Sequence, residues 1–250
     1  MEAFTIELAG IAIAVQASCP STRQLCRDYL TQRAAELTIV CTPEDLRLER
    51  EISARKDEQE GIAPVCHSDA YLETLALYRK IAAAVIGRQV LLVHGSAAAV
   101  DGQGYLFCAR SGVGKSTHAA LWRQELPKLG HTVFCVNDDK PLLRVEADGI
   151  YVCGTPWDGK HRLSCNCSVP LRAVCFLSRG TVNEIRRIPR REAWPLLLAQ
   201  SFQPPAPAQA AQAVQLIDAI LQKTAQYMLR CNMDPAAARI AFEGMQDNEI

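Results

Sequence analysis

The residues that most clearly carry chemistry are the glycines, the lysine and the hydroxyl side chains of segment 109–117, ARSGVGKST. A glycine-containing loop between a strand and a helix can close its backbone N–H groups around phosphate oxygens, and the helix N-terminus adds a partial positive charge. Lys115 is expected to contact the β- and γ-phosphates, and the Ser116 hydroxyl to ligate Mg²⁺. The residues predicted to bind a nucleotide are Ser111, Gly112, Val113, Gly114, Lys115, Ser116 and Thr117.

The usual pattern of such a loop is G-x-x-x-x-G-K-[ST], and Ala109 stands at its first position. Alanine is compatible with this position if the backbone there has a negative φ. The alternative interpretation is a glycine turn capped by Ser111, with no ligand.

Two adjacent carboxylates, Asp138 and Asp139, follow the apolar run VFCV about twenty residues downstream. Aspartates at the end of a buried strand beside a phosphate loop can hold Mg²⁺ or accept a hydroxyl proton, the two tasks that phosphoryl transfer requires. The alternative is that they cap the turn before Lys140. His94, which follows the run LLV, is a second candidate for the site, although a histidine at a strand end is also compatible with a structural role.

Segment 154–162, GTPWDGKHR, joins a tryptophan and two glycines to basic and titratable side chains. This composition is typical of a loop that contacts a phosphate or a substrate. Lys160 and Arg162 are expected to stabilise charge on the transferring phosphoryl group. A solvated basic turn is equally consistent with these residues.

The composition of the chain indicates which class of protein carries these motifs. The chain has 250 residues, 27 basic and 27 acidic side chains and a hydrophobic share of 49%. These values are typical of a globular protein with a sizeable core, and zero net charge disfavours a large nucleic-acid footprint. No apolar run approaches the roughly 20 residues of a membrane-spanning helix. The N-terminal apolar stretch lacks a basic region and alternates like a strand, so we expect a cytoplasmic protein with no membrane partner.

Eleven cysteines are present, an odd number. Most lie within apolar runs, where a free cysteine behaves as a small buried hydrophobe. Cys165 and Cys167 form the one close pair, and a single Cys-x-Cys is weak support for zinc. We therefore predict reduced, structural thiols.

The first part of the chain is expected to form a small α+β domain, residues 1–88. A hairpin is predicted around Ala9-Gly10, and a strand over 37–41. Thr42 and Asp45 form a capping box for a helix over 43–54, followed by a loop over 56–61. Ser68 caps a longer helix that ends at Gly87, whose predicted packing face carries Tyr71, Leu75, Tyr78, Ala82 and Val85.

Residues 89–250 are predicted to form the second domain, built around the phosphate loop. Hairpins are expected with turns at 101–104 and 146–149, a helix over 115–126 and strands over 133–136, 173–177 and 185–188. His118 is expected on the surface of the first helix of this domain. Later helices are predicted around Ile217 and after Pro235, whereas Pro195 either begins a helix or kinks one.

Taken together, VHGSAAAVDGQGYLFCARSGVGKSTH and VNDDKPLL resemble the core of the HPr kinase/phosphorylase family. The resemblance extends more distantly to the phosphoenolpyruvate carboxykinase-type P-loop fold, so the fold class is expected to be α/β (α+β), with a mixed sheet and β-hairpins. It implies ATP- and Mg²⁺-dependent phosphorylation of a serine hydroxyl. In that interpretation Asp138 takes the proton with His94 nearby and Asp139 holds Mg²⁺, while the reverse assignment of the two aspartates stays open.

The resemblance implies a protein or peptide acceptor, either an HPr-like phosphocarrier or a precursor peptide, and leaves a homo-oligomer open. Two other functions stay open. A small-metabolite kinase or carboxykinase-like enzyme would need no protein acceptor. A non-catalytic regulator would bind ATP without consuming it.

Overall fold

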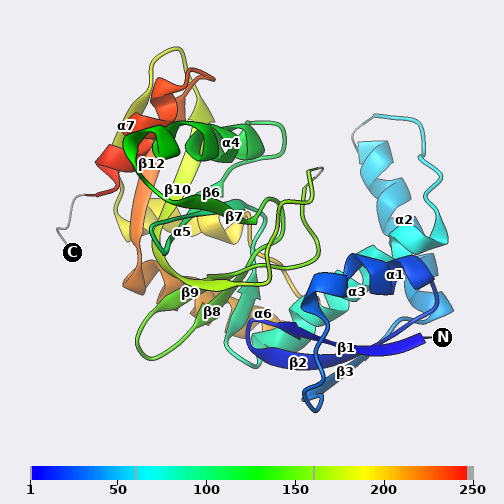
Figure 1. Ribbon diagram of the computed structural model, residues 1–250. Helices are drawn as coiled ribbons and strands as arrows, with labels where there is room; N and C mark the ends of the chain where they lie inside the picture. The colour runs from blue at the N-terminus through cyan, green and yellow to red at the C-terminus, as the bar shows by residue number, and fades with distance from the viewer. Residues whose placement is uncertain (1, 60, 160, 247–250) are drawn as a thin grey trace. The chain divides into compact units, whose positions relative to one another are not determined.

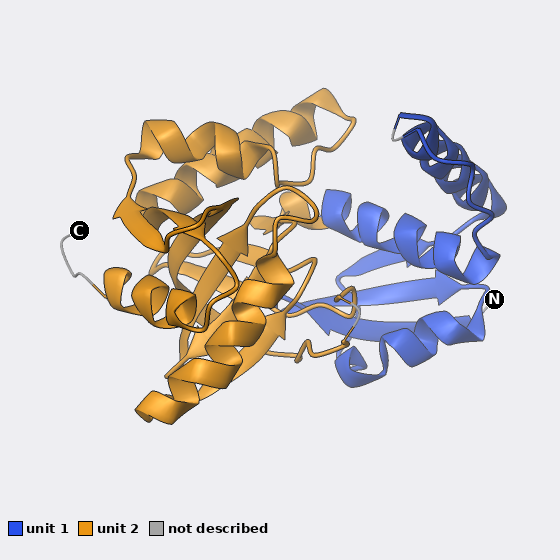
Figure 2. Ribbon diagram, turned by 90° about the horizontal axis from the view of Figure 1, so that it is seen from above, with its two compact units in different colours: residues 1–84 blue, residues 85–250 orange. Residues whose placement is uncertain are grey.

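Contacts divide the chain into two compact units, Met1–Ala84 and Val85–Ile250 (Figure 2). The computed structural model describes residues 2–59, 61–159 and 161–246. Whether residues 1–88 and 89–250 fold as independent domains stays a prediction. No helix in the described part of the chain is long and apolar enough to cross a membrane.

The first unit is built on a three-stranded sheet in the order β1-β2-β3 (Figure 1). β1 and β2 form the predicted hairpin, and Ala9 and Gly10 both have positive φ, as a two-residue type I′ turn requires. β3 adds parallel to β2. The elements of this unit are β1 (Glu2–Leu8), β2 (Ile11–Ala17), α1 (Pro20–Leu25), η1 (Arg27–Tyr29), β3 (Leu37–Val40), α2 (Pro43–Gln59) and α3 (Asp69–Ile86).

Two expectations for the helices of this unit need correction. The capping box is present, because the Thr42 amide donates to the Asp45 carboxylate over 2.8 Å, but α2 continues to Gln59 through the predicted loop. Its last turns contain Arg, Lys, Glu and Gln, which are good helix formers, so nothing in the sequence ends it at residue 54. In α3, the predicted packing residues Tyr78, Ala82 and Val85 are buried, but Tyr71 is 48% exposed, and Leu72 and Leu77 are buried in addition.

The second unit contains a curled, mixed nine-stranded sheet in the described residues, in the order β4-β8-β9-β10-β6-β5-β7. β12 pairs parallel with β10, and β11 pairs antiparallel with β12. The elements of this unit are β4 (Val90–Leu92), β5 (Ser96–Val100), β6 (Gln103–Cys108), α4 (Lys115–Glu125), η2 (Leu126–Leu129), β7 (Val133–Asn137), β8 (Leu142–Val145), β9 (Ile150–Cys153), β10 (Ser168–Arg179), β11 (Glu184–Arg187), α5 (Arg190–Leu198), α6 (Pro207–Lys223), β12 (Ala225–Cys231) and α7 (Ala236–Gly244).

The central strands of this sheet are buried on both faces. In β6, Leu106 lies in a core with α5 and α6, whereas Phe107 lies in a second core with α4 and α7. This alternation follows from the period of two in a strand, and it explains why β6 reads as a continuous apolar run. The helices therefore hold β6 between two apolar layers, and the loop at its carboxyl end starts from a fixed strand.

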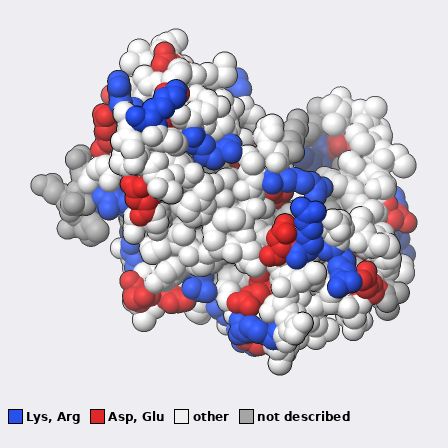
Figure 3. All heavy atoms as spheres, in the orientation of Figure 1, with Lys and Arg blue, Asp and Glu red and all other residues white. Residues whose placement is uncertain are grey.

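The predicted hairpins and helices of this unit are present, with three differences. β12 was not predicted, and β10 begins at Ser168, five residues before the predicted strand over 173–177, and pairs with three strands. Pro195 lies inside α5, beyond its first turn, so it does not begin the helix. Basic and acidic side chains lie in small mixed groups on the face shown in Figure 3.

Candidate functional site

The glycine-containing loop leads from β6 directly into α4, as the sequence predicts. Gly112 and Gly114 have φ of 77° and 122°, backbone conformations that residues other than glycine rarely adopt. Their missing Cβ atoms would meet nothing within 4 Å, so the loop opens outward. No side chain caps the N-terminus of α4 at Gly114. The first amides of α4 are therefore available to an anion, in the arrangement that binds phosphate.

Lys115 lies beneath this loop. Its Nζ donates a hydrogen bond to the Ala109 carbonyl over 3.0 Å, and the residue is 8% exposed. Burial lowers the pKa of the Lys115 ammonium, and the neighbouring Asp139 and Asp138 act in the opposite direction. The ammonium is thus tethered inside the loop by a carbonyl that a phosphate oxygen could replace. Ser111, Ser116 and Thr117 are exposed.

Arg179 is a contact of the loop that the sequence did not indicate. It lies at the end of β10, and its guanidinium donates to the carbonyls of Gly112 and Val113. The contact joins residues more than sixty positions apart, so no local pattern could reveal it.

The pairing of three strands brings the separate candidate residues together. β5 lies between β6 and β7 and runs antiparallel to both, with Ser96 opposite Phe107 and Ala97 opposite Asn137. The start of β5 is therefore beside the carboxyl ends of its two neighbours. His94, the phosphate loop and the Asp138-Asp139 turn meet at one edge of the sheet.

Asp138 is covered, with 6% exposure. The Ser96 hydroxyl donates to its Oδ1 over 2.8 Å. Its Oδ2 faces Gly159, where an added Cβ would lie only 2.6 Å from that oxygen. The carboxylate is thus fixed by β5 on one side and approached by the backbone of segment 154–162 on the other.

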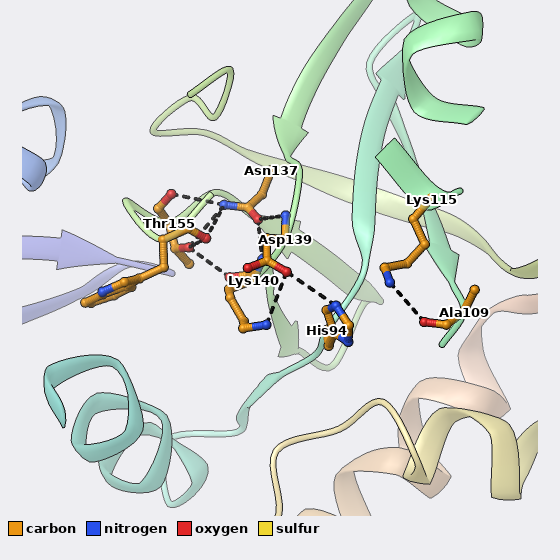
Figure 4. Close-up of polar contacts among 8 residues, drawn as sticks. His94, Ala109, Lys115, Asn137, Asp139, Lys140 and Thr155 are labelled. Carbon is orange, nitrogen blue, oxygen red and sulfur yellow. Dashed lines mark hydrogen bonds and ion pairs between the residues drawn. The ribbon is translucent and has the colours of Figure 1, made fainter. Parts of the chain in front are cut away.

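Asp139 is more open, with 37% of its side chain exposed. Its carboxylate contacts Lys140 Nζ over 3.2 Å and His94 Nε2 over 3.4 Å (Figure 4). Burial, together with the positive charges of Lys140 and Lys115, lowers the pKa of His94 to about 4. At neutral pH the imidazole is therefore uncharged, and its contact with Asp139 is a polar contact rather than an ion pair.

Asn137 is the buried centre of this turn. Its Oδ1 accepts from the amides of Asp139 and Lys140, over 2.9 and 2.6 Å. Its Nδ2 donates to the carbonyl and hydroxyl of Thr155, over 3.0 and 3.1 Å (Figure 4). Asn137 follows the strand predicted over 133–136, and the sequence pattern assigned it no function, because Thr155 lies far along the chain.

Segment 154–162 holds the remaining predicted residues. Gly154 is required by close packing, since an added Cβ would overlap the Cys165 carbonyl. Arg162 is exposed, with φ of 48°, and its amide donates to the Gly159 carbonyl over 3.2 Å. Lys160 lies outside the described residues. The phosphate-contacting roles of both stay predictions.

His118 lies in the core, not on the surface of α4 as expected. It is 2% exposed, accepts from Trp122 Nε1 over 3.0 Å, and stacks edge-on against Phe107. Burial lowers its pKa to about 4. It belongs to the packing beneath the phosphate loop.

All eleven cysteines are free thiols. Burial raises the pKa of Cys108 and of Cys135 to about 12, so both are neutral hydrophobes at physiological pH. The Sγ atoms of Cys165 and Cys167 lie 2.6 Å apart. Within the described ranges, no group of three or more His, Cys, Asp and Glu side chains is arranged to hold a metal ion.

No protein-family model matches the chain, and no curated protein matches it. Among solved structures, the HPr(Ser) kinase/phosphatase from Coxiella burnetii is similar over 62% of this chain and 99% of its own, with 12% identity and a TM-score of 0.34. At this level of similarity, the activity of that enzyme is not carried over to this chain.

Proposed function

We propose that the protein is an ATP- and Mg²⁺-dependent kinase that phosphorylates a serine hydroxyl on a small protein or peptide. The observation that carries the proposal is the meeting of an open phosphate loop with two carboxylates and an uncharged histidine at one sheet edge. Phosphoryl transfer needs a phosphate cradle, charge neutralisation and a base, and these residue types supply each of them.

The loop fits the phosphates of ATP. The open glycine positions, the uncapped start of α4 and the buried Lys115 ammonium together offer amide donors and one positive charge. Bound ATP would supply the phosphoryl group, and Mg²⁺ would neutralise its negative charge. The residues proposed to hold the nucleotide are Ser111, Gly112, Val113, Gly114, Lys115, Ser116 and Thr117.

Magnesium fits Ser116 and Asp139. Both are accessible, and Mg²⁺ in such sites uses one or two protein oxygens besides water and phosphate oxygens, so a cage of three protein ligands is not required. Asp139 is the more exposed of the two carboxylates, which favours it over Asp138 as the ligand of a solvated Mg²⁺ ion.

Asp138 is the proposed base. Ser96 holds its Oδ1, which leaves Oδ2 as the atom that accepts the serine proton. His94, which is uncharged near neutral pH, contacts Asp139 beside this proposed base. Lys160 and Arg162 are proposed to stabilise charge on the transferring group.

The acceptor class comes from the resemblance of His94-Gly95, segment 111–116 and Asp138-Asp139 to the HPr kinase/phosphorylase family, of the phosphoenolpyruvate carboxykinase-type fold. It favours an HPr-like phosphocarrier or a precursor peptide. No specific observation favours a metabolite kinase or a non-catalytic regulator, and both are outcomes of the test below.

The test measures ADP formation by the purified chain with ATP and Mg²⁺, alone and with HPr, a panel of serine peptides or a small-molecule extract. ADP formation that depends on a protein or peptide acceptor is expected. Formation that depends on small molecules alone would replace the proposal with a metabolite kinase. Tight ATP binding without ADP formation under any condition would replace it with a regulator.

A further inference from the structure

Every hydrogen-bonding atom of the Asn137 side chain has a partner, and the residue is 0% exposed. The carbonyl oxygen serves the Asp138–Lys140 turn, through the amides of Asp139 and Lys140. The amide nitrogen serves a different segment, through the Thr155 carbonyl and hydroxyl and, over 3.4 Å, the Trp157 carbonyl. These partners also fix which atom of the amide is oxygen and which is nitrogen.

A second bond closes the connection between the two segments. The Thr155 hydroxyl donates to the Lys140 carbonyl over 2.8 Å, while it accepts from Asn137 Nδ2. The turn is therefore tied to segment 154–157 through both a side-chain amide and a hydroxyl. Fully satisfied buried networks of this kind hold one arrangement, because each lost bond leaves a buried polar atom without a partner.

Few residue types can occupy this position. An aspartate keeps the acceptor and loses the donor, alanine loses both, and glutamine adds a methylene to a fully packed site. Asparagine provides one acceptor and one donor on a side chain of the length that fits this site. Its neighbours in sequence are the two carboxylates to which the proposed function assigns proton transfer and Mg²⁺.

We propose that Asn137 is a positioning residue, which fixes the Asp138-Asp139 turn against segment 154–157 and thereby sets both carboxylates relative to the phosphate loop. The inference rests on the proposed kinase function. Asn137 contacts no substrate in this role. It acts through Asp138 and Asp139.

The test compares Asn137→Ala, Asn137→Asp, Thr155→Val and Thr155→Ser in the full chain. Activity is expressed as kcat per nucleotide-binding site, with sites counted by titration with a fluorescent ATP analogue, so that a misfolded fraction does not enter the result. Gln226→Ala is the matched control. Gln226 lies in β12, and its buried side-chain amide also donates to backbone carbonyls, those of Leu221 and Thr224 at the end of α6.

Asn137→Ala is expected to lower kcat about a hundredfold, the effect of misplacing a reacting group by roughly 1 Å, and to leave the KM for ATP nearly unchanged. Thr155→Val is expected to lower kcat about tenfold, whereas Thr155→Ser, which keeps the hydroxyl, is expected to retain the wild-type kcat. Gln226→Ala is expected to reduce stability and leave kcat per site unchanged. A kcat per site for Asn137→Ala or Thr155→Val equal to that of wild type would overturn the inference.

Hydrogen exchange keeps this test separate from the proposed function. The amides of Asp139 and Lys140 are expected to exchange about tenfold faster in Asn137→Ala, and at nearly the wild-type rate in Asn137→Asp, which retains the acceptor. Unchanged exchange in Asn137→Ala would overturn the positioning role even if the kinase is active. If Asn137→Ala exchanges faster but the wild-type protein transfers no phosphate, the kinase proposal is overturned, whereas the role of Asn137 in holding the turn still stands.

Discussion

Replacing Gly159 with alanine places a methyl group against the Asp138 carboxylate. The new Cβ would lie 2.6 Å from Oδ2, whereas ordinary contacts begin at 3.4 Å, so the carboxylate must move by about 0.8 Å. Gly159 does not have the positive φ that disfavours alanine, so the backbone itself is not strained. The substitution therefore displaces the proposed base and leaves the fold in place.

A displacement of roughly 1 Å in a reacting group costs about a hundredfold in rate, or about 3 kcal/mol in the barrier. We expect Gly159→Ala to lower kcat by about this factor and to leave the Kd for ATP and the unfolding midpoint close to wild type. The assay is phosphoryl transfer under saturating ATP, with nucleotide titration in parallel. Gly149→Ala is the matched control, because its Cβ would meet nothing within 4 Å. If Gly159→Ala keeps kcat within about threefold of the control, Asp138 is not the base.

Three further perturbations follow from the same geometry. Ser96→Ala removes the hydrogen bond to Asp138, so kcat should fall about tenfold at unchanged ATP affinity; a loss of affinity instead would place Ser96 in the nucleotide site. Arg179→Ala removes the contact with the loop carbonyls, and we expect ATP affinity to weaken by about threefold, measured by titration; a changed kcat with unchanged affinity would contradict this role. The third perturbation is pH. The buried His118 has a pKa of about 4 when folded and 6.5 in its ordinary state, so the unfolded chain binds the extra proton between these values. Stability should be unaffected by this group above pH 6.5 and should fall as the pH drops toward 4, by about 3 kcal/mol in total. In urea unfolding, His118→Gln should lose this part of the pH dependence, and an unchanged profile would refute the assignment.

Sequence reasoning succeeded where a local pattern determines the structure. The turn at Ala9-Gly10 and the capping box at Thr42 each rest on residues within a few positions of one another, and both are present in the structure. The glycine-containing loop over 109–114 and the helix after it are likewise local, because glycines with positive φ and the lysine lie in one short segment.

The remaining features depend on contacts between distant segments. β12 follows α6 without a turn signal of its own, and it is a strand because it pairs with β10. Arg179 reaches the loop from another strand, and Asn137 meets Thr155 across the sheet edge. Burial of His118 depends on Trp122 and Phe107 around it, which a surface-helix pattern does not reveal. Spacing along the chain cannot provide such contacts, because register and packing decide them.

The most direct measurement is the transfer of γ-labelled phosphate to a serine acceptor by wild type and by Lys115→Ala. The Lys115 ammonium is tethered inside the loop, through Ala109, so its loss should abolish transfer while the chain stays folded. We expect labelled phosphoserine with wild type and background label with Lys115→Ala. Equal labelling by both proteins, or none by wild type with any acceptor, would contradict it.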